Sequence, residues 1–258
     1  MLLTDVLTAT NMNPDYYKFI PSFIKAWKKL FPNVNIHIIV IAEEIIEELQ
    51  QYKQYLKLFK PIKDVETSFI AQNIRLFYPA LINQAKGGII ITDMDMIPMN
   101  TIYYTEPIKD ISHDKFICYR PLSCVGKDEM VICYNIAHQN IWSEIFNIKT
   151  EADIIERINS IYKKDKYIGE NANKHYKPYW ITDQLYLYEQ TQKWNKNTNN
   201  LIILDDSKYM NRLDKLNIFN NNPNIMLKEI KYKQLSDFHM IRPYNKFYNQ
   251  IDSIINLL

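Results

Sequence analysis

Two short runs of β-branched residues constrain the fold of this 258-residue chain more than any other feature of its sequence. Val34 to Ile41 and Ile89 to Thr92 are dominated by valine and isoleucine, which is typical of strands buried in a parallel sheet. Residues 4–10 form a third candidate strand. Apolar residues recur at helical spacing between these strands, over residues 14–31, about 43–59 and about 68–85. This alternation predicts an α/β fold with a mostly parallel central sheet and helices on both faces.

The second half of the chain has a less regular pattern. We expect strands over residues 115–119, 130–135 and 201–204. We expect helices over residues 138–145, 152–163, 182–192 and 247–257, and polar loops over 193–200 and 220–224. No internal repeat or linker interrupts the pattern, so a single domain over residues 1–258 is predicted.

Glycine is scarce, and this excludes several phosphate-binding loops. The chain has 4 glycines, at Gly87, Gly88, Gly126 and Gly169. Their spacing rules out a dinucleotide-binding G-x-G-x-x-G turn, a Walker A loop and a kinase glycine-rich loop. A formal net charge of +2 also argues against a nucleic-acid-binding protein. A protein of this kind that handles phosphate is expected to use a metal ion or side chains.

The cysteines and the first residues bear on the compartment. The 3 cysteines form no C-x-x-C pair and predict neither a disulfide framework nor a zinc site. The first residues lack a basic flank and a long apolar stretch, and no N-x-Ser/Thr acceptor occurs in the chain. We therefore expect a cytoplasmic protein with no signal peptide and no transmembrane segment.

The segment Gly87 to Met99 carries the strongest chemical signal, because a buried strand there leads directly into Asp93-Met94-Asp95. In extended chain, residues two apart point the same way, so both carboxylates are expected on one face. Open α/β sheets bind ligands at the carboxyl ends of their strands. Paired carboxylates are suitable ligands for Mg²⁺ or Mn²⁺, which can in turn hold a diphosphate. Solvated acids at a strand end are the alternative.

On these residues the chain resembles metal-dependent glycosyltransferases of the GT-A fold, which use nucleotide-sugar donors. Asp93-Met94-Asp95 corresponds to the D-x-D motif of that family, and Arg75, on the preceding predicted helix, to a basic residue that faces the donor. The resemblance implies that Thr8, Ala9 and Thr10 hold the nucleotide. It also implies a nucleotide-binding half over about residues 1–100 and an acceptor and sugar half over about 101–258.

Three later segments extend the resemblance. Trp180-Ile181-Thr182-Asp183-Gln184 is similar to a W-x-x-D-Q motif, which implies a sugar-side carboxylate at Asp183, a donor contact at Gln184 and an acceptor contact at Trp180. Asn135 corresponds to an Asn near the sugar. The segment from Asp237 to Tyr244 is similar to a C-terminal histidine motif, with His239 as a metal ligand and Arg242 near the donor. The chain departs from the family by lacking the glycines that often follow the Asn and the His.

The resemblance implies transfer of a sugar from a nucleoside diphosphate sugar, with a UDP-sugar favoured, to a hydroxyl of a glycan or protein. Mn²⁺ or Mg²⁺ would be held by Asp93, Asp95 and His239, with Met94 lying beside the donor. Asp93 could instead meet the ribose or a metal-bound water. Asp183 would be the general base of an inverting reaction, which we slightly favour. In a retaining reaction Asp183 or Asn135 would stabilise the sugar cation.

Two other functions remain open from the sequence. Haloacid-dehalogenase-like phosphatases also place D-x-D after a buried strand, with the first Asp, here Asp93, as the nucleophile. Their motif usually stands near the N-terminus and has a hydroxyl residue where this chain has Ile97. The other alternative is a nucleotide-sugar-binding or glycan-binding protein that keeps the fold without turnover.

Overall fold

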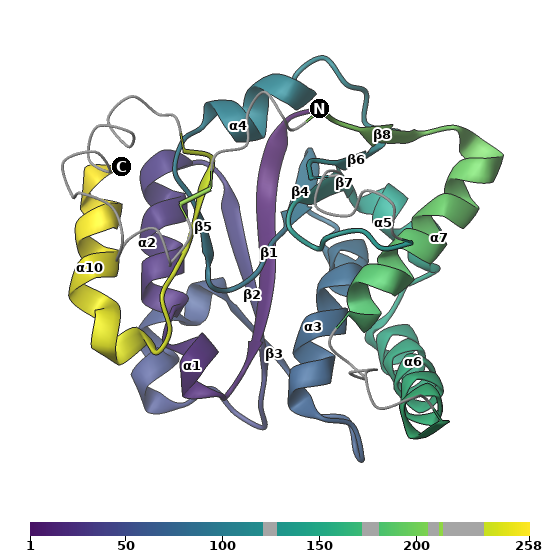
Figure 1. Ribbon diagram of the computed structural model, residues 1–258, viewed down its shortest axis with the longest axis horizontal. Helices are drawn as coiled ribbons and strands as arrows, with labels where there is room; N and C mark the ends of the chain where they lie inside the picture. The colour runs from purple at the N-terminus through teal and green to yellow at the C-terminus, as the bar shows by residue number, and fades with distance from the viewer. Residues whose placement is uncertain (121–127, 172–180, 206–211, 214–234) are drawn as a thin grey trace.

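The chain folds around one large sheet with helices on both sides (Figure 1). The computed structural model describes residues 1–120, 128–171, 181–205, 212–213 and 235–258, with the backbone alone for 165–171. Within these residues no helix is long and apolar enough to cross a membrane.

The central sheet has seven strands in the order β3-β2-β1-β4-β7-β6-β8. Strands β1, β2, β3 and β4 pair in parallel, β7 runs antiparallel to both β4 and β6, and β8 is parallel to β6. The strands are β1 (Leu3–Asn11), β2 (Asn35–Ile41), β3 (Leu56–Phe59), β4 (Gly88–Ile91), β6 (Phe116–Cys118), β7 (Asn135–His138) and β8 (Leu201–Ile203). The predicted mostly parallel α/β sheet is confirmed.

Figure 1 shows α2 and α10 on one side of the sheet and α3, α6 and α7 on the other. The α-helices are α1 (Pro14–Tyr17), α2 (Ile20–Leu30), α3 (Thr67–Phe77), α4 (Ile102–Thr105), α5 (Gln139–Phe146), α6 (Glu151–Asn171), α7 (Thr182–Thr198) and α10 (Tyr244–Leu257). Three short 3-10 helices are η1 (Glu47–Tyr55), η2 (Tyr78–Leu81) and η3 (Glu106–Ile108).

The sheet has a separate hydrophobic core on each face because side chains alternate along its strands. In β4, Ile90 packs in the core beneath α2 and α10, whereas Ile89 and Ile91 pack in the core beneath α3, α5, α6 and α7. All three isoleucines are fully buried. A strand that is apolar on both faces is therefore required at the centre of this sheet, as the Ile89–Ile91 run predicts.

Gly87, directly before β4, and Gly88, its first residue, allow close packing against neighbouring strands. A Cβ on Gly87 would lie 2.3 Å from the carbonyl oxygen of Leu2, and one on Gly88 would lie 2.6 Å from Ile136 of β7. Backbone cannot yield to such a contact as a flexible side chain could. The glycines are thus explained by the approach of β1 and β7 to β4.

A second, two-stranded sheet joins distant parts of the chain. Strand β5 (Met96–Pro98) pairs antiparallel with β9 (Asp237–His239), with Met96 opposite His239. The amide of Met240 also donates to the carbonyl oxygen of Asp95 at 2.8 Å. Residues 95–98, which follow β4, are thereby hydrogen-bonded to residues 237–240.

Three of the predicted elements are wrong. Residues 43–59 are not one α-helix: they form the 3-10 helix η1 followed by β3. Few of the η1 residues are buried, so it lacks the apolar face that would favour an α-helix.

The predicted strand over 130–135 is displaced to β7, where Ile136 and Ala137 face the two cores. The predicted loop over 193–200 is the end of α7, anchored by buried Trp194. The predicted loop over 220–224 lies outside the described residues.

Candidate active site

The two carboxylates of the D-x-D segment lie at the carboxyl end of β4 but do not face the same partner. The chain turns at residues 94–95, where Met94 is buried in the core. The expectation that Asp93 and Asp95 share one face of an extended chain is therefore wrong. Side-chain exposure differs as well, at 39% for Asp93 and 8% for Asp95.

Arg75 joins Asp93 to Asp183. It is a buried residue in the last turn of α3, and its Nη1 donates to Asp93 Oδ1 while its Nη2 donates to Asp183 Oδ2 at 3.1 Å. The Nε atom donates to the carbonyl oxygen of Gln72 at 3.1 Å, which fixes the plane of the guanidinium. Asp183 lies in the first turn of α7. One planar cation thus links three elements that are far apart in sequence.

The pKa values of the two carboxylates shift in opposite directions, although Arg75 lowers both. For Asp183, burial is the largest effect and the nearby charge of Asp93 adds to it, so its pKa rises to about 6 in spite of Arg75. For Asp93, burial alone would raise the pKa, but the attraction of Arg75 outweighs it and the pKa lies below its usual value. Carboxylates whose pKa values are pushed apart in this way are characteristic of functional sites.

Cys133 is a contact of Asp93 that the sequence did not indicate. Its Sγ atom donates to Asp93 Oδ2 at 3.3 Å, on the side of the carboxylate away from Arg75. Burial, followed by the charge of Asp93, raises the pKa of the Cys133 thiol well above its usual value. The thiol therefore stays protonated and acts as a hydrogen-bond donor rather than as a nucleophile.

Asp95 meets His239, as the resemblance implied. His239 Nε2 lies 3.2 Å from Asp95 Oδ2, although the residues are 144 positions apart. Arg242 Nε lies 3.5 Å from the same oxygen. The Arg242 guanidinium also bonds the hydroxyl of Tyr16 and stacks 5.0 Å from the centre of its ring. The backbone pairing of β5 with β9 places this group of side chains together.

The donor set fits a divalent cation in part. A carboxylate oxygen and an imidazole nitrogen in contact, as in Asp95 and His239, are ligand types that Mn²⁺ accepts. Asp93 does not complete a set of three, because its oxygens are bonded to Arg75 and Cys133. Within the described residues there is no group of three or more His, Cys, Asp or Glu that could hold a metal ion. A cation here would take its remaining ligands from water and substrate, as Mg²⁺ commonly does.

A hollow lies at the carboxyl ends of β1 and β2. It is lined by the segments Asn11–Asn13 and Ile41–Glu44, with Ile46, Pro61 and Thr67. Its surface is mostly apolar, and its volume is about 360 Å³. Thr8, Ala9 and Thr10, for which donor contacts are predicted, lie in β1 just before it and are buried. The Asn11 side chain donates to Thr67 Oγ1 at 3.1 Å, which ties the end of β1 to the start of α3.

The other residues predicted to contact the donor or the acceptor are distributed as follows. Asn135 is fully buried, and its Nδ2 donates to the carbonyl oxygens of Val131 and Ile132 at 2.7 Å each. Gln184 is half-buried, beside Asp183 on α7, and its carbonyl oxygen accepts from the Met130 amide. Trp180 lies outside the described residues.

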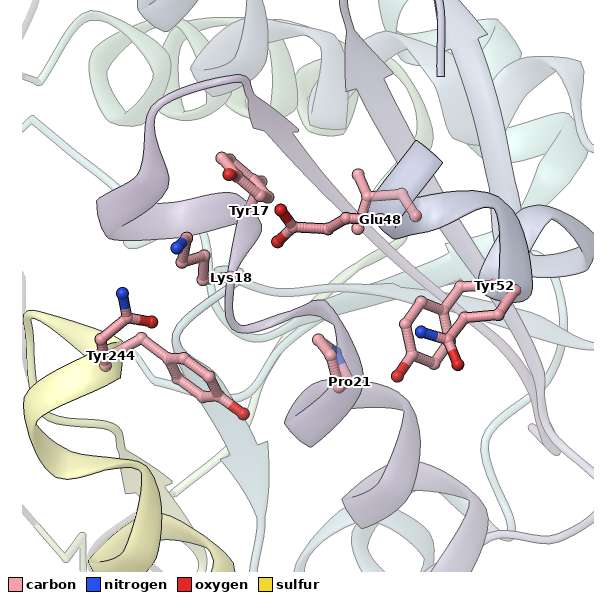
Figure 2. Close-up of a pocket in the computed structure, with 9 residues that line it drawn as sticks. Tyr17, Lys18, Pro21, Glu48, Tyr52 and Tyr244 are labelled. Atoms are coloured by element: carbon pink, nitrogen blue, oxygen red, sulfur yellow. The ribbon is translucent and has the colours of Figure 1, made fainter. Parts of the chain in front are cut away.

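A second hollow, shown in Figure 2, lies away from these carboxylates. Tyr17 and Lys18 from the α1 region, Glu48 and Tyr52 of η1 and Tyr244 of α10 line it, and its volume is about 180 Å³. The Tyr244 hydroxyl lies 3.1 Å from Ser22 Oγ of α2. None of the residues predicted to act on substrate lines this hollow.

Comparisons with known proteins agree with the fold. No protein-family model matches the sequence, and no curated protein matches it. Among solved structures, an active-site mutant of LgtC is 12% identical with a TM-score of 0.52, over 98% of this chain and 95% of that one. The bifunctional glycosyltransferase WbbM is 12% identical with a TM-score of 0.50, over 98% of this chain and 49% of that one. Galactosyltransferase LgtC with donor and acceptor sugar analogs is 10% identical with a TM-score of 0.49, over 99% and 96%.

These likenesses define the fold. The chain has the architecture of solved glycosyltransferases, which confirms the predicted GT-A-like arrangement of sheet and helices. The side chains at the carboxyl end of β4 provide the separate, chemical part of the argument.

Proposed function

We propose that this protein is a glycosyltransferase that moves a sugar from a nucleoside diphosphate sugar to a hydroxyl of a glycan or protein. The observation that carries the proposal is two groups of charged side chains that include the aspartates after β4. Arg75 joins Asp93 to Asp183, and His239 contacts Asp95. The same fold is found in solved glycosyltransferases, which supports this class of reaction over others that use paired carboxylates.

The nucleotide part of the donor is proposed to bind in the hollow at the ends of β1 and β2. Its asparagine amides can bond a base edge, and the carboxylates of Glu43 and Glu44 can accept from ribose hydroxyls. The first hundred residues then form the nucleotide-binding half of a single domain, and the later residues supply the sugar and acceptor side. A UDP-sugar is the donor we favour.

Asp95 and His239 are proposed to hold Mn²⁺ or Mg²⁺, with Asp93 close by. Such an ion would offset the negative charge that develops on the departing diphosphate. Arg242, which is bound to Asp95 and only partly buried, is placed to contact the same phosphates. Arg75 keeps Asp93 ionised and oriented.

Asp183 is proposed to act on the sugar side. With a pKa near 6, most Asp183 side chains are ionised at neutral pH and able to accept the proton of an acceptor hydroxyl. This is the role required in an inverting transfer, which we favour slightly. In a retaining transfer the same carboxylate would stabilise positive charge on the sugar, and Asn135, whose amide is bonded to its own loop, would support it less directly.

A thermal-shift screen of nucleoside diphosphate sugars, with and without Mn²⁺, tests the proposal. We expect one donor to raise the melting temperature in the presence of Mn²⁺ and to do so less in chelator, because a ligand that binds the native state stabilises it. Assays of that donor then separate the alternatives. Sugar transfer supports the proposal, whereas binding without turnover indicates a binding protein, and phosphate release from phosphomonoesters indicates a phosphatase.

A further inference from the structure

A second buried charge cluster lies next to the candidate cation site. Asp237, on β9, is fully buried and accepts hydrogen bonds from Arg120 Nη2, from Ser236 Oγ at 2.8 Å, from Arg212 Nε at 3.2 Å and from Tyr134 Oη at 3.4 Å. Arg120 is almost fully buried as well. A desolvated carboxylate with this many donors has a single well-defined position.

Arg120 also contacts two tyrosines besides Asp237. Its Nε donates to the Tyr103 hydroxyl at 3.2 Å, and its guanidinium lies 4.9 Å from the centre of the Tyr134 ring. Tyr134 directly follows Cys133, the hydrogen-bond donor to Asp93. The cluster therefore contacts both flanks of the candidate site, one through Cys133 and the other through β9.

Strand β9 needs such an anchor because it is short. It has three residues, pairs with a three-residue strand on one side and meets only the isolated bridge of Leu213 on the other within the described chain. Pairing of this length is marginally stable by itself. Asp237 and His239 are two residues apart in a strand, so their side chains leave it on the same face. A fixed Asp237 thus fixes the direction of His239.

We propose that the Arg120–Asp237 ion pair positions His239 against Asp95. Arg120 and Asp237 are positioning residues: they act through β9 and need not touch the substrate. For its link to catalysis the inference rests on the proposed function, in which Asp95 and His239 hold a divalent cation. Mutation of the groups that orient a metal ligand typically lowers metal affinity about 10- to 100-fold.

The test replaces both charges together in the variant Arg120→Met/Asp237→Leu. Replacing a buried pair by apolar residues of similar size keeps the core packed, whereas removing one partner leaves an uncompensated charge. We expect the amide of Met240, which bonds to Asp95, to exchange its hydrogen roughly tenfold faster than in the wild type, while amides of β1 and β2 keep their protection. We also expect the Kd for Mn²⁺, measured by calorimetry, to rise about 10- to 100-fold.

Asp5→Asn is the matched control. Asp5 is likewise a buried carboxylate that is hydrogen-bonded by several side chains, including His37, but it lies at the amino end of β1, away from the site. This variant is expected to leave both Met240 exchange and Mn²⁺ affinity as in the wild type. If the double variant does not fold, Arg212→Gln removes only the partly exposed partner of Asp237, and Met240 exchange is again expected to accelerate by several-fold to about tenfold.

The outcomes are distinct. Unchanged Met240 exchange, or faster exchange with unchanged Mn²⁺ affinity, overturns the positioning role. If the wild-type protein binds no Mn²⁺, the proposed cation site fails, and the exchange measurement still decides whether the ion pair positions His239.

Discussion

The buried carboxylates at the two ends of the central sheet differ in their hydrogen-bond and ion-pair partners. At the amino end, Asp5 contacts His37 at 2.8 Å and also accepts hydrogen bonds from Thr4 at 2.6 Å and from Asn35 at 3.1 Å. At the carboxyl end, Arg75 is shared between the two carboxylates of Asp93 and Asp183. In the first group several donors serve one carboxylate, whereas in the second one guanidinium serves two carboxylates.

The pKa values express this contrast. Burial alone would raise the pKa of Asp5, but its hydrogen bonds to His37, Thr4 and Asn35 outweigh burial and lower it. At the other end, burial is the largest effect and the charge of Asp93 adds to it, so the pKa of Asp183 rises to about 6 in spite of Arg75. Carboxylates that remain incompletely compensated at the carboxyl ends of parallel strands mark the place where a ligand binds.

The largest expected effect is on activity in Asp95→Ala. This change removes the carboxylate that contacts His239, and therefore one of the two proposed ligands of the cation. We expect transfer to fall at least about a thousandfold, because a metal ion supplies several kcal/mol of charge stabilisation to the reaction. The test compares the transfer activity of Asp95→Ala with that of Asp5→Asn. Both variants are assayed with the donor found in the thermal-shift screen. Similar losses in both would contradict a special role for the carboxyl end.

Asp183→Asn is expected to lose turnover while it keeps the nucleotide. The asparagine retains the size of the side chain but cannot accept a proton, so kcat is expected to fall about 10²- to 10⁴-fold. Nucleotide affinity, measured by calorimetry, is expected to change little because the hollow at β1 and β2 is separate from Asp183. Loss of donor binding instead would reassign Asp183 to the donor pocket.

The same variant has a pH-dependent stability. The pKa of Asp183 is higher in the folded state, about 6, than the roughly 3.9 of an unfolded chain, so the folded state binds more protons between these pH values. The contribution of Asp183 therefore lowers the free energy of unfolding as the pH rises from about 4 to 6. Relative to the wild type, Asp183→Asn should gain about 2 kcal/mol in free energy of unfolding between pH 4 and pH 8, measured by urea titration in chelator. A constant difference across this range would show that Asp183 is not desolvated.

The smallest expected effect is at the amino end, and it has the opposite sign. The pKa of Asp5 is lowered by folding, so its contribution is present above about pH 4 and is lost as pH falls through its folded value. Asp5→Asn should cost about 1 kcal/mol of unfolding free energy at pH 7 and less at pH 3, with activity retained. Chemical denaturation at the two pH values makes this measurement, and a larger cost at pH 3 would refute the assignment.

The central sheet was predictable because its strands carry a local signal. The Ile89–Ile91 run, apolar on both faces, marks the central strand β4. The helical spacing over about residues 68–85 marks α3, although that helix ends at Phe77 and the predicted helix was too long. The 3-10 helix η1 and strand β3 were missed because neither has a periodic apolar pattern of useful length. Strands of three residues, such as β5 and β9, are defined by their partners and not by their own sequence.

The residues of the site were predicted better than the contacts among them. Arg75, Asp93, Asp95, Asp183 and His239 were all selected from motifs, yet the sequence did not indicate that Arg75 bridges Asp93 and Asp183. The buried Met94 turns the chain between the two aspartates, and no pattern in three residues encodes that turn. Arg120 and Cys133 carry no motif. Asp237 offered one weak signal, its spacing of two residues from His239.

The pairing of β5 with β9 also sets an order in time. Asp95 is synthesised 144 positions before its partner His239. A growing chain therefore contains the residues of the hollow at β1 and β2 before it contains both Asp95 and His239. Closing so long a loop carries an entropic cost that short-range pairs such as β1 with β2 do not meet. The contact between Asp95 and His239 therefore forms only after β9 has been synthesised.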